Sequence, residues 1–132
     1  MAVVTKIETP GGGYVYKWSL TTADPNGDAV FLGGAPDKSV QFVATAAGTA
    51  TAVLQCSNQI TSKQGAVDLI NRMTDVDPTS WELATDPQGN DISKTGSDLE
   101  AVLENAAYWR PILSVVGTAA VWDVYLFSRR GY

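Results

Sequence analysis

The chain alternates apolar and polar residues with a period of two through several short segments, which Gly-, Pro- and Asp-containing turns separate. In the segment 14–20, three aromatic residues and Leu20 share one face, while Lys17 and Ser19 share the other. This period is typical of half-buried β-strands. Similar segments follow at 29–32, 39–45, 49–57, 80–83, 108–116 and 120–128. The pattern predicts an all-β fold, an antiparallel β-sandwich of jelly-roll-like type, in a single domain over 14–132.

Two segments interrupt this pattern and predict one or two short helices. Within 62–73, three apolar residues lie close to helical spacing. The sequence Ser97-Asp98-Leu99-Glu100 fits a capping box, which predicts a helical turn or two through about Glu104. The first 13 residues, which end in three glycines, are expected to form a flexible N-terminal arm.

The chain of 132 residues contains no histidine, and its only cysteine is Cys56. A Ser-His-Asp or Cys-His catalytic arrangement therefore cannot be built within this chain, and neither can a zinc site of Cys and His ligands. An intramolecular disulfide is excluded as well, so the core alone must stabilise the fold. Cys56 shares one face of its predicted strand with small apolar residues, which predicts a buried, inert thiol.

Nine Lys and Arg against 14 Asp and Glu give a net charge of −5. Nucleic-acid binders normally carry a basic surface that offsets phosphate charge, so this balance argues against DNA or RNA as the main ligand. It argues in the same way against an anionic membrane surface. The chain has no apolar run near the roughly 18 residues that span a bilayer, and its start does not have the pattern of a signal peptide. We therefore expect synthesis and folding in a reducing cytosol.

Two acidic turns resemble calcium-binding loops in part. They contain Asp24, Asn26 and Asp28 in the first turn and Asp86, Asn90 and Asp91 in the second. Calcium prefers several such oxygens converging on one point, but the twelve-residue loop with a terminal Glu is absent. Turn chemistry alone accounts for Asp and Asn at these positions. We therefore expect neither a metal site nor a cofactor.

Glu100 and Glu104 lie four residues apart, on one face of the predicted helix. Some hydrolases use two carboxylates, but the capping box already accounts for Glu100, and a domain of this size has little room for a cleft. We therefore expect a protein that is not an enzyme.

Aromatic and basic residues are the candidates for an interface. Alternation places three of the four tryptophans on inward faces and leaves Trp109, beside Tyr108 and Arg110, as the one expected at the surface. Arginines near the C-terminus either form a docking patch for an acidic partner or hold strand ends in water. The expected interface residues are Trp109, Arg110, Arg129, Arg130 and Tyr132.

Several short motifs follow one another in a fixed order along the chain. They are Ser39-Val40-Gln41-Phe42, Ala52-Val53-Leu54-Gln55-Cys56-Ser57-Asn58, Trp81-Glu82-Leu83, Asp86-Pro87-Gln88-Gly89-Asn90, Tyr108-Trp109-Arg110-Pro111 and Arg129-Arg130. Together they resemble a group of small tailed-bacteriophage virion proteins of β-sandwich or jelly-roll type, over roughly residues 14–130. The chain departs from this group at 59–78, where only a short turn is expected.

The resemblance is greatest to capsid decoration (cement) proteins. It implies a structural protein that is made in the host cytoplasm, binds the major capsid protein at the outer capsid surface and stabilises the virion. It also implies a homo-oligomer, with a trimer as one form. For a protein of this kind, we expect the flexible N-terminal arm to become ordered on docking. Two alternatives remain open. One is a sugar-binding or host-adsorption module on a head or tail fibre, because the Leu-Gln…Ser-Asn…Trp pattern is also similar to discoidin-like carbohydrate binders. The other is a further tail or neck component.

Overall fold

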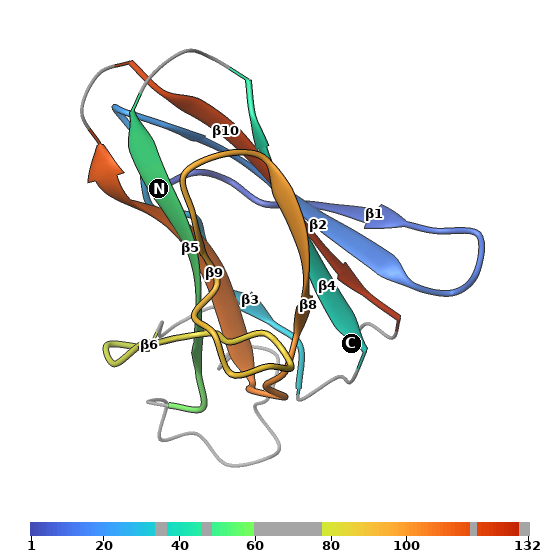
Figure 1. Cartoon of the computed structure of the whole chain (residues 1–132). Helices are drawn as coiled ribbons and strands as arrows, with labels where there is room; N and C mark the ends of the chain where they lie inside the picture. Colours follow the sequence, from blue (N-terminus) through green and yellow to red (C-terminus); the bar gives the residue numbers. More distant parts are fainter. Residues whose placement is uncertain (34–36, 46–48, 60–77, 117–118, 130–132) are drawn as a thin grey trace.

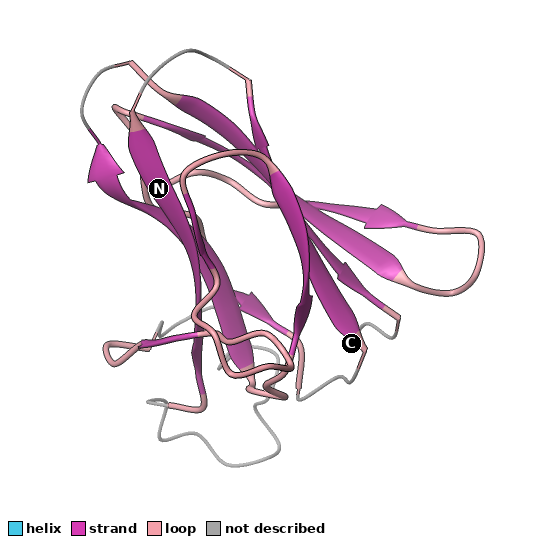
Figure 2. Ribbon diagram, viewed as in Figure 1, coloured by secondary structure: helices cyan, strands magenta, loops and turns pink. Residues whose placement is uncertain are grey.

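A computed structural model describes residues 1–33, 37–45, 49–59, 78–116 and 119–129 (Figure 1). In these residues, ten strands form two antiparallel sheets that pack face to face, so the predicted all-β sandwich is confirmed. Figure 2 shows only strands and loops in this described part. It therefore holds no helix long and apolar enough to cross a membrane. The helix predicted within 62–73 lies outside the described residues.

The first sheet consists of β1 (Thr5–Glu8), β2 (Tyr14–Thr21), β10 (Val121–Ser128), β4 (Lys38–Ala44) and β8 (Asp98–Val102), in that spatial order. At its centre β10 pairs antiparallel with both β2 and β4. The second strand in sequence, β2, therefore lies beside β10, the last strand that the structure describes.

The second sheet consists of β3 (Val30–Phe31), β9 (Tyr108–Val116), β5 (Ala50–Ser57) and β6 (Glu82–Leu83), and β7 (Ser93–Lys94) also pairs with β5. The register between β5 and β9 shifts at a bulge between Thr51 and Ala52. From β2 to β5, and again from β7 to β10, successive strands alternate between the two sheets. Neighbours within a sheet are therefore mostly distant in sequence.

The core lies between the sheets, and the inward faces predicted from alternation supply much of it. Trp18 on β2 and Trp122 on β10 are buried there, and so are Phe42 on β4 and Leu54 on β5. The rings of Phe42 and Trp122 meet edge to face, with 6.3 Å between their centroids, a geometry that aromatic pairs favour. These bulky residues fill the space between the sheets without any disulfide.

The helix predicted from Ser97 to about Glu104 is wrong, because this stretch contains strand β8. Leu99 lies opposite Gln41 on the neighbouring strand β4. The hydroxyl of Ser97 accepts a 3.0 Å hydrogen bond from the amide of Ala44 instead of capping a helix. A capping box contributes about a kilocalorie per mole, so pairing with a neighbouring strand overrides it.

The flexible arm expected over 1–13 is also corrected, because this segment contains strand β1. It pairs with the first half of β2, and the turn between them includes the three glycines. Gly12 has a φ of 84°, a left-handed conformation that glycine adopts without steric cost. A Cβ on Gly13 would lie 2.9 Å from the Phe127 ring. The glycines thus allow a hairpin rather than a loose lead-in.

Candidate functional site

The outward side of the first sheet has an apolar hollow at its middle. Its volume is about 200 Å³, and it is lined by Val15, Ser39, Gln41, Leu99, Tyr125 and Phe127. These residues come from β2, β4, β8 and β10, so four strands build the hollow together.

The register of the sheet explains why these side chains meet. Phe127 lies opposite Val15 on one side of β10, and Val15 in turn lies opposite Ile7 on β1. In the next row, Tyr125 lies opposite Gln41, which lies opposite Leu99. Residues opposite one another in a sheet point to the same side. The two rows therefore run in parallel across the sheet.

We call Ile7, Val15, Leu99, Tyr125 and Phe127 the outer apolar face. Two of these side chains are largely open to solvent: Leu99 is 61% exposed and Ile7 is 45% exposed. The other three are half-buried. An apolar surface of this kind, carried on the rigid strands of a sheet, suits contact with another protein.

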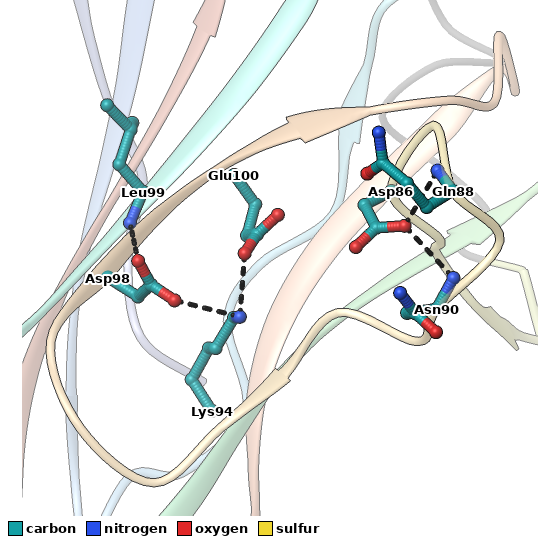
Figure 3. A network of polar contacts seen from close by, with 7 residues as sticks. All are labelled: Asp86, Gln88, Asn90, Lys94, Asp98, Leu99 and Glu100. Carbon is teal, nitrogen blue, oxygen red and sulfur yellow. Dashed lines mark hydrogen bonds and ion pairs between the residues drawn. The ribbon is translucent and has the colours of Figure 1, made fainter.

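An ion network holds β8, which carries Leu99, against the second sheet (Figure 3). The ammonium of Lys94 on β7 lies 2.8 Å from carboxylate oxygens of both Asp98 and Glu100 on β8. The other oxygen of Asp98 accepts a 2.8 Å hydrogen bond from the amide of Leu99. Lys94 thus links the two sheets by binding the two residues that flank Leu99 on β8.

The same contacts shift two pKa values. Hydrogen bonds to Asp98 and Glu100 raise the pKa of Lys94, and the hydrogen bond from Lys94, followed by that from the Leu99 amide, lowers the pKa of Asp98. Both shifts favour the charged forms, so the pair stays ionised at neutral pH. The network is close to solvent, so its role is to position β8 rather than to supply much stability.

The outward side of the second sheet carries a second group of side chains, which includes a cation stacked on an aromatic ring. The guanidinium of Arg110 on β9 lies 4.3 Å from the centre of the Trp81 ring, and its Nε donates a 2.8 Å hydrogen bond to Gln55 Oε1. The indole N–H of Trp81 donates to the carbonyl of Pro78 at 2.9 Å. Leu83, opposite Gln55 in the register, is 38% exposed. Trp81, one of the three tryptophans that alternation placed on inward faces, instead lies partly exposed beside Arg110, so this prediction is wrong.

A second hollow, of about 380 Å³, lies on the other side of β6, because Glu82 pairs with Cys56 and so points away from the side that carries Leu83 and Gln55. It is lined by Cys56, Ser57, Asn58, Glu82, Glu104, Asn105 and Ala106. Glu104 accepts hydrogen bonds from the amide and hydroxyl of Thr85, and Asn58 Oδ1 accepts the amide of Ala107 at 2.9 Å. These bonds within the protein already use part of the hydrogen-bonding capacity of the lining.

Cys56 lies at the buried side of this hollow. Burial, followed by the carboxylates of Glu104 and Glu82, raises the pKa of its thiol to about 11. The thiol is therefore protonated at neutral pH and a poor nucleophile. Its predicted burial is confirmed, and its raised pKa agrees with the predicted lack of reactivity.

The structure describes three of the five residues expected to form an interface, and these three do not form one surface. Trp109 is fully buried, with its indole N–H donating to the carbonyl of Ala106 at 2.9 Å, so its predicted exposure is wrong. Arg110 is half-buried on the second sheet, whereas Arg129 follows the end of β10 in the first sheet and its side chain is 71% exposed. The other two, Arg130 and Tyr132, lie outside the described residues.

The acidic turn after Trp81 follows turn chemistry, as expected. One carboxylate oxygen of Asp86 accepts the amides of Gln88 and Asn90, each at 3.0 Å, and Gly89 has a φ of 86°. Figure 3 shows these bonds at the tip of the turn. In the part of the chain that the structure describes, no three His, Cys, Asp or Glu residues are grouped in a way that could hold a metal ion.

The predicted carboxylate pair also separates. Glu100 lies on β8 beside Lys94, whereas Glu104 follows that strand and binds Thr85. Comparison of the chain with protein-family models, with curated proteins and with solved structures found no match.

Proposed function

We propose that the protein is a virion structural protein, a capsid decoration protein that binds the major capsid protein at the outer capsid surface and stabilises the particle. The observation that carries this proposal is the outer apolar face, with its hollow of about 200 Å³ and with Leu99 61% exposed. A partner that covers this face removes apolar surface from water, and burying one leucine side chain alone stabilises a complex by about 1.5–3 kcal/mol.

The topology supports the finer description of the fold as a jelly roll. Strands β2-β10-β4-β8 and β3-β9-β5-β6 form the two sheets, and much of the chain crosses from one sheet to the other at each step. Jelly rolls of eight strands occur in viral capsid and lectin domains. This likeness is one of fold alone, so it supports both the capsid proposal and its sugar-binding alternative.

The net charge of the chain is compatible with a protein that is first free in the cytoplasm and then bound to the capsid. A net charge of −5 keeps copies apart in the host cytoplasm before assembly. On the capsid, the outer apolar face then supplies the contact area.

The test is a binding measurement with purified protein and capsids that lack it. We expect co-sedimentation with capsids and a rise in their thermal disruption temperature. Leu99→Glu puts a charge on the outer apolar face and is expected to weaken binding at least about tenfold. Leu83→Glu is the matched control, because it makes the same change on the outward side of the second sheet.

The results of this test distinguish between the two possible docking faces and between the candidate functions. Loss of binding with Leu99→Glu but not with Leu83→Glu supports the proposed docking face. The reverse pattern moves docking to the second sheet. Failure of the unchanged protein to bind capsids contradicts the decoration proposal, and binding to isolated tails instead favours a tail or neck component.

A sugar-binding module is the second candidate, and a specific observation favours it. Trp81 is partly exposed on the outward side of the second sheet, where the guanidinium of Arg110 lies 4.3 Å from the centre of its ring and donates a hydrogen bond to Gln55. Exposed aromatic rings beside hydrogen-bonding side chains suit sugars, because a ring packs on the apolar face of the sugar. Saturable binding to a glycan array that Trp81→Ala abolishes would support this candidate, whereas Trp109→Ala would only disturb the core.

A further inference from the structure

Among the strands that the structure describes, β1 forms one edge of the first sheet. All four of its residues, Thr5 to Glu8, are exposed, and in the described part of the chain β2 is the only strand that pairs with it. Figure 1 shows the hairpin of β1 and β2 extending away from the second sheet. An open edge of this kind is a template for pairing with another strand.

The hairpin turn reveals which main-chain groups point outward. The amide of Thr9 donates a 2.9 Å hydrogen bond to the carbonyl of Gly13, so Thr9 faces β2. In an antiparallel pair, successive residues direct their N–H and C=O groups to alternate sides. The N–H and C=O groups of Glu8 and Lys6 therefore point away from β2, while those of Ile7 point towards it.

This alternation limits how β1 can pair with a second copy of itself. Antiparallel pairing requires outward residues to face outward residues, so a two-fold axis must pass through a residue rather than between two. An axis at Lys6 places Lys6 opposite its own copy, and an axis at Glu8 does the same for Glu8. Both arrangements oppose like charges, which destabilises a sheet.

An axis at Ile7 gives the complementary arrangement. Lys6 of each copy then lies opposite Glu8 of the other, and each such pair can exchange two main-chain hydrogen bonds. Ile7 meets its own copy on the side of the sheet that carries the outer apolar face, because Ile7 lies opposite Val15. The Lys6 ammonium lies 4.1 Å from the centre of the Tyr14 ring, on the same side of the sheet as Glu8.

We propose that β1 pairs antiparallel with β1 of a second copy about a two-fold axis at Ile7, which joins two five-stranded sheets into one. The occupant is a second copy because the charge pattern Lys6-Ile7-Glu8 is complementary to itself in this register. The pairing also continues the outer apolar face from one copy to the next. It goes beyond the proposed function, since it requires no capsid.

The first test changes the charges. The interface is short, so we expect a weak dimer, measured by analytical ultracentrifugation at protein concentrations up to about 1 mM. Lys6→Glu makes both cross-strand pairs acidic and is expected to raise the dimer dissociation constant roughly tenfold. The double variant Lys6→Glu with Glu8→Lys restores unlike pairs and is expected to restore the dimer. This variant has the composition and net charge of the unchanged protein, so it is the matched control.

The second test fixes the register by a cross-link. The Cα atoms of two residues in a non-hydrogen-bonded antiparallel pair lie about 4.5 Å apart, within the range of a disulfide. Ile7→Cys is therefore expected to cross-link to its own copy under mild oxidation. Thr5→Cys is the control, because two copies of position 5 would lie about 14 Å apart in this register. The natural Cys56 is buried and does not compete.

The outcomes separate cleanly. A dimer that weakens in Lys6→Glu, recovers in the double variant and cross-links at position 7 but not at position 5 supports the proposal. A monomer at all concentrations overturns it, and so does a trimer that Lys6→Glu leaves unchanged. Equal cross-linking at positions 5 and 7 overturns the register. None of these results depends on capsid binding, so the decoration proposal stands or falls separately.

Discussion

Trp18 and Trp122 are both fully buried, yet their indole N–H groups have different surroundings. The Trp18 indole donates a 2.8 Å hydrogen bond to the carbonyl of Asp28. The Trp122 indole N–H has no hydrogen-bond partner among the described residues. A buried donor without a partner costs about 1–3 kcal/mol. At the scale of single residues, the core therefore carries an unpaired polar group at its centre.

Replacing each tryptophan by phenylalanine separates the two cases. Both variants lose a similar amount of buried ring. Trp18→Phe also leaves the carbonyl of Asp28 without its donor, whereas Trp122→Phe removes a donor that was already unpaired. We expect Trp18→Phe to lower the free energy of unfolding by about 1–3 kcal/mol more than Trp122→Phe does. Urea denaturation of both variants measures this difference, and equal losses would show that the two indoles do not differ as described.

At the scale of elements, the loop from β2 to β3 is built around a close approach at Gly27. A Cβ at this position would lie 2.8 Å from both Pro111 Cδ and Trp18 Cδ1. The amide of Gly27 donates a 2.9 Å hydrogen bond to the carbonyl of Pro111. The loop can lie against β9 and beside Trp18 only because Gly27 has no side chain.

Gly27→Ala is expected to lower the free energy of unfolding by about 1–3 kcal/mol, because the loop or its neighbours must shift. Gly96→Ala is the matched control, since a Cβ there would have no neighbour within 4 Å. We expect the control to change the free energy by less than about 0.5 kcal/mol. Thermal and chemical unfolding of the two variants measure the effect, and a neutral Gly27→Ala would mean that the loop is not packed as described.

Particular elements explain what could be predicted from the sequence. The strands β2 and β10 alternate cleanly because one face of each is buried, so their type and inward faces follow from the pattern. Leu99 in β8 was missed because a capping box is a local signal, whereas pairing with β4 is not. The exposure of Trp81 was mispredicted because it precedes β6, which has only two residues, too few to reveal which face is inward. Trp109 was mispredicted because neighbouring residues at the start of β9, such as Tyr108 and Trp109, are both buried and do not alternate. The hairpin at β1 was missed because its four residues are all exposed.

At the scale of the whole molecule, the central position of β10 makes it one of the last strands to open. It lies between β2 and β4 in the first sheet, and alternate residues such as Val124 and Leu126 are fully buried. Amides in such a strand exchange with solvent only when the entire domain unfolds, while edge strands open locally.

Hydrogen exchange is expected to follow this order. In dilute protein, the main-chain amide of Glu8 should be among the first in the first sheet to exchange, because it lies on an exposed strand and points away from β2. A slow Glu8 amide would contradict this. The amides of Val124 and Leu126 should be among the last, with an opening free energy equal to that of global unfolding. Exchange measured by NMR checks both statements. If β10 opened more easily than β5, the two sheets would unfold as separate units rather than as one domain.

The central place of β10 also has a consequence for synthesis. A ribosome makes the chain from the N-terminus, so β2 and β4 emerge well before β10, the strand that lies between them: β2 ends at Thr21 and β4 at Ala44, whereas β10 begins at Val121. Until Val121–Ser128 has left the ribosome, the edges of β2 and β4 that later pair with β10 have no partner strand. The aromatic side chains that the folded core buries are then also exposed. The nascent chain therefore depends on remaining unpaired or on being shielded by chaperones, and the first sheet closes only after β10 has emerged.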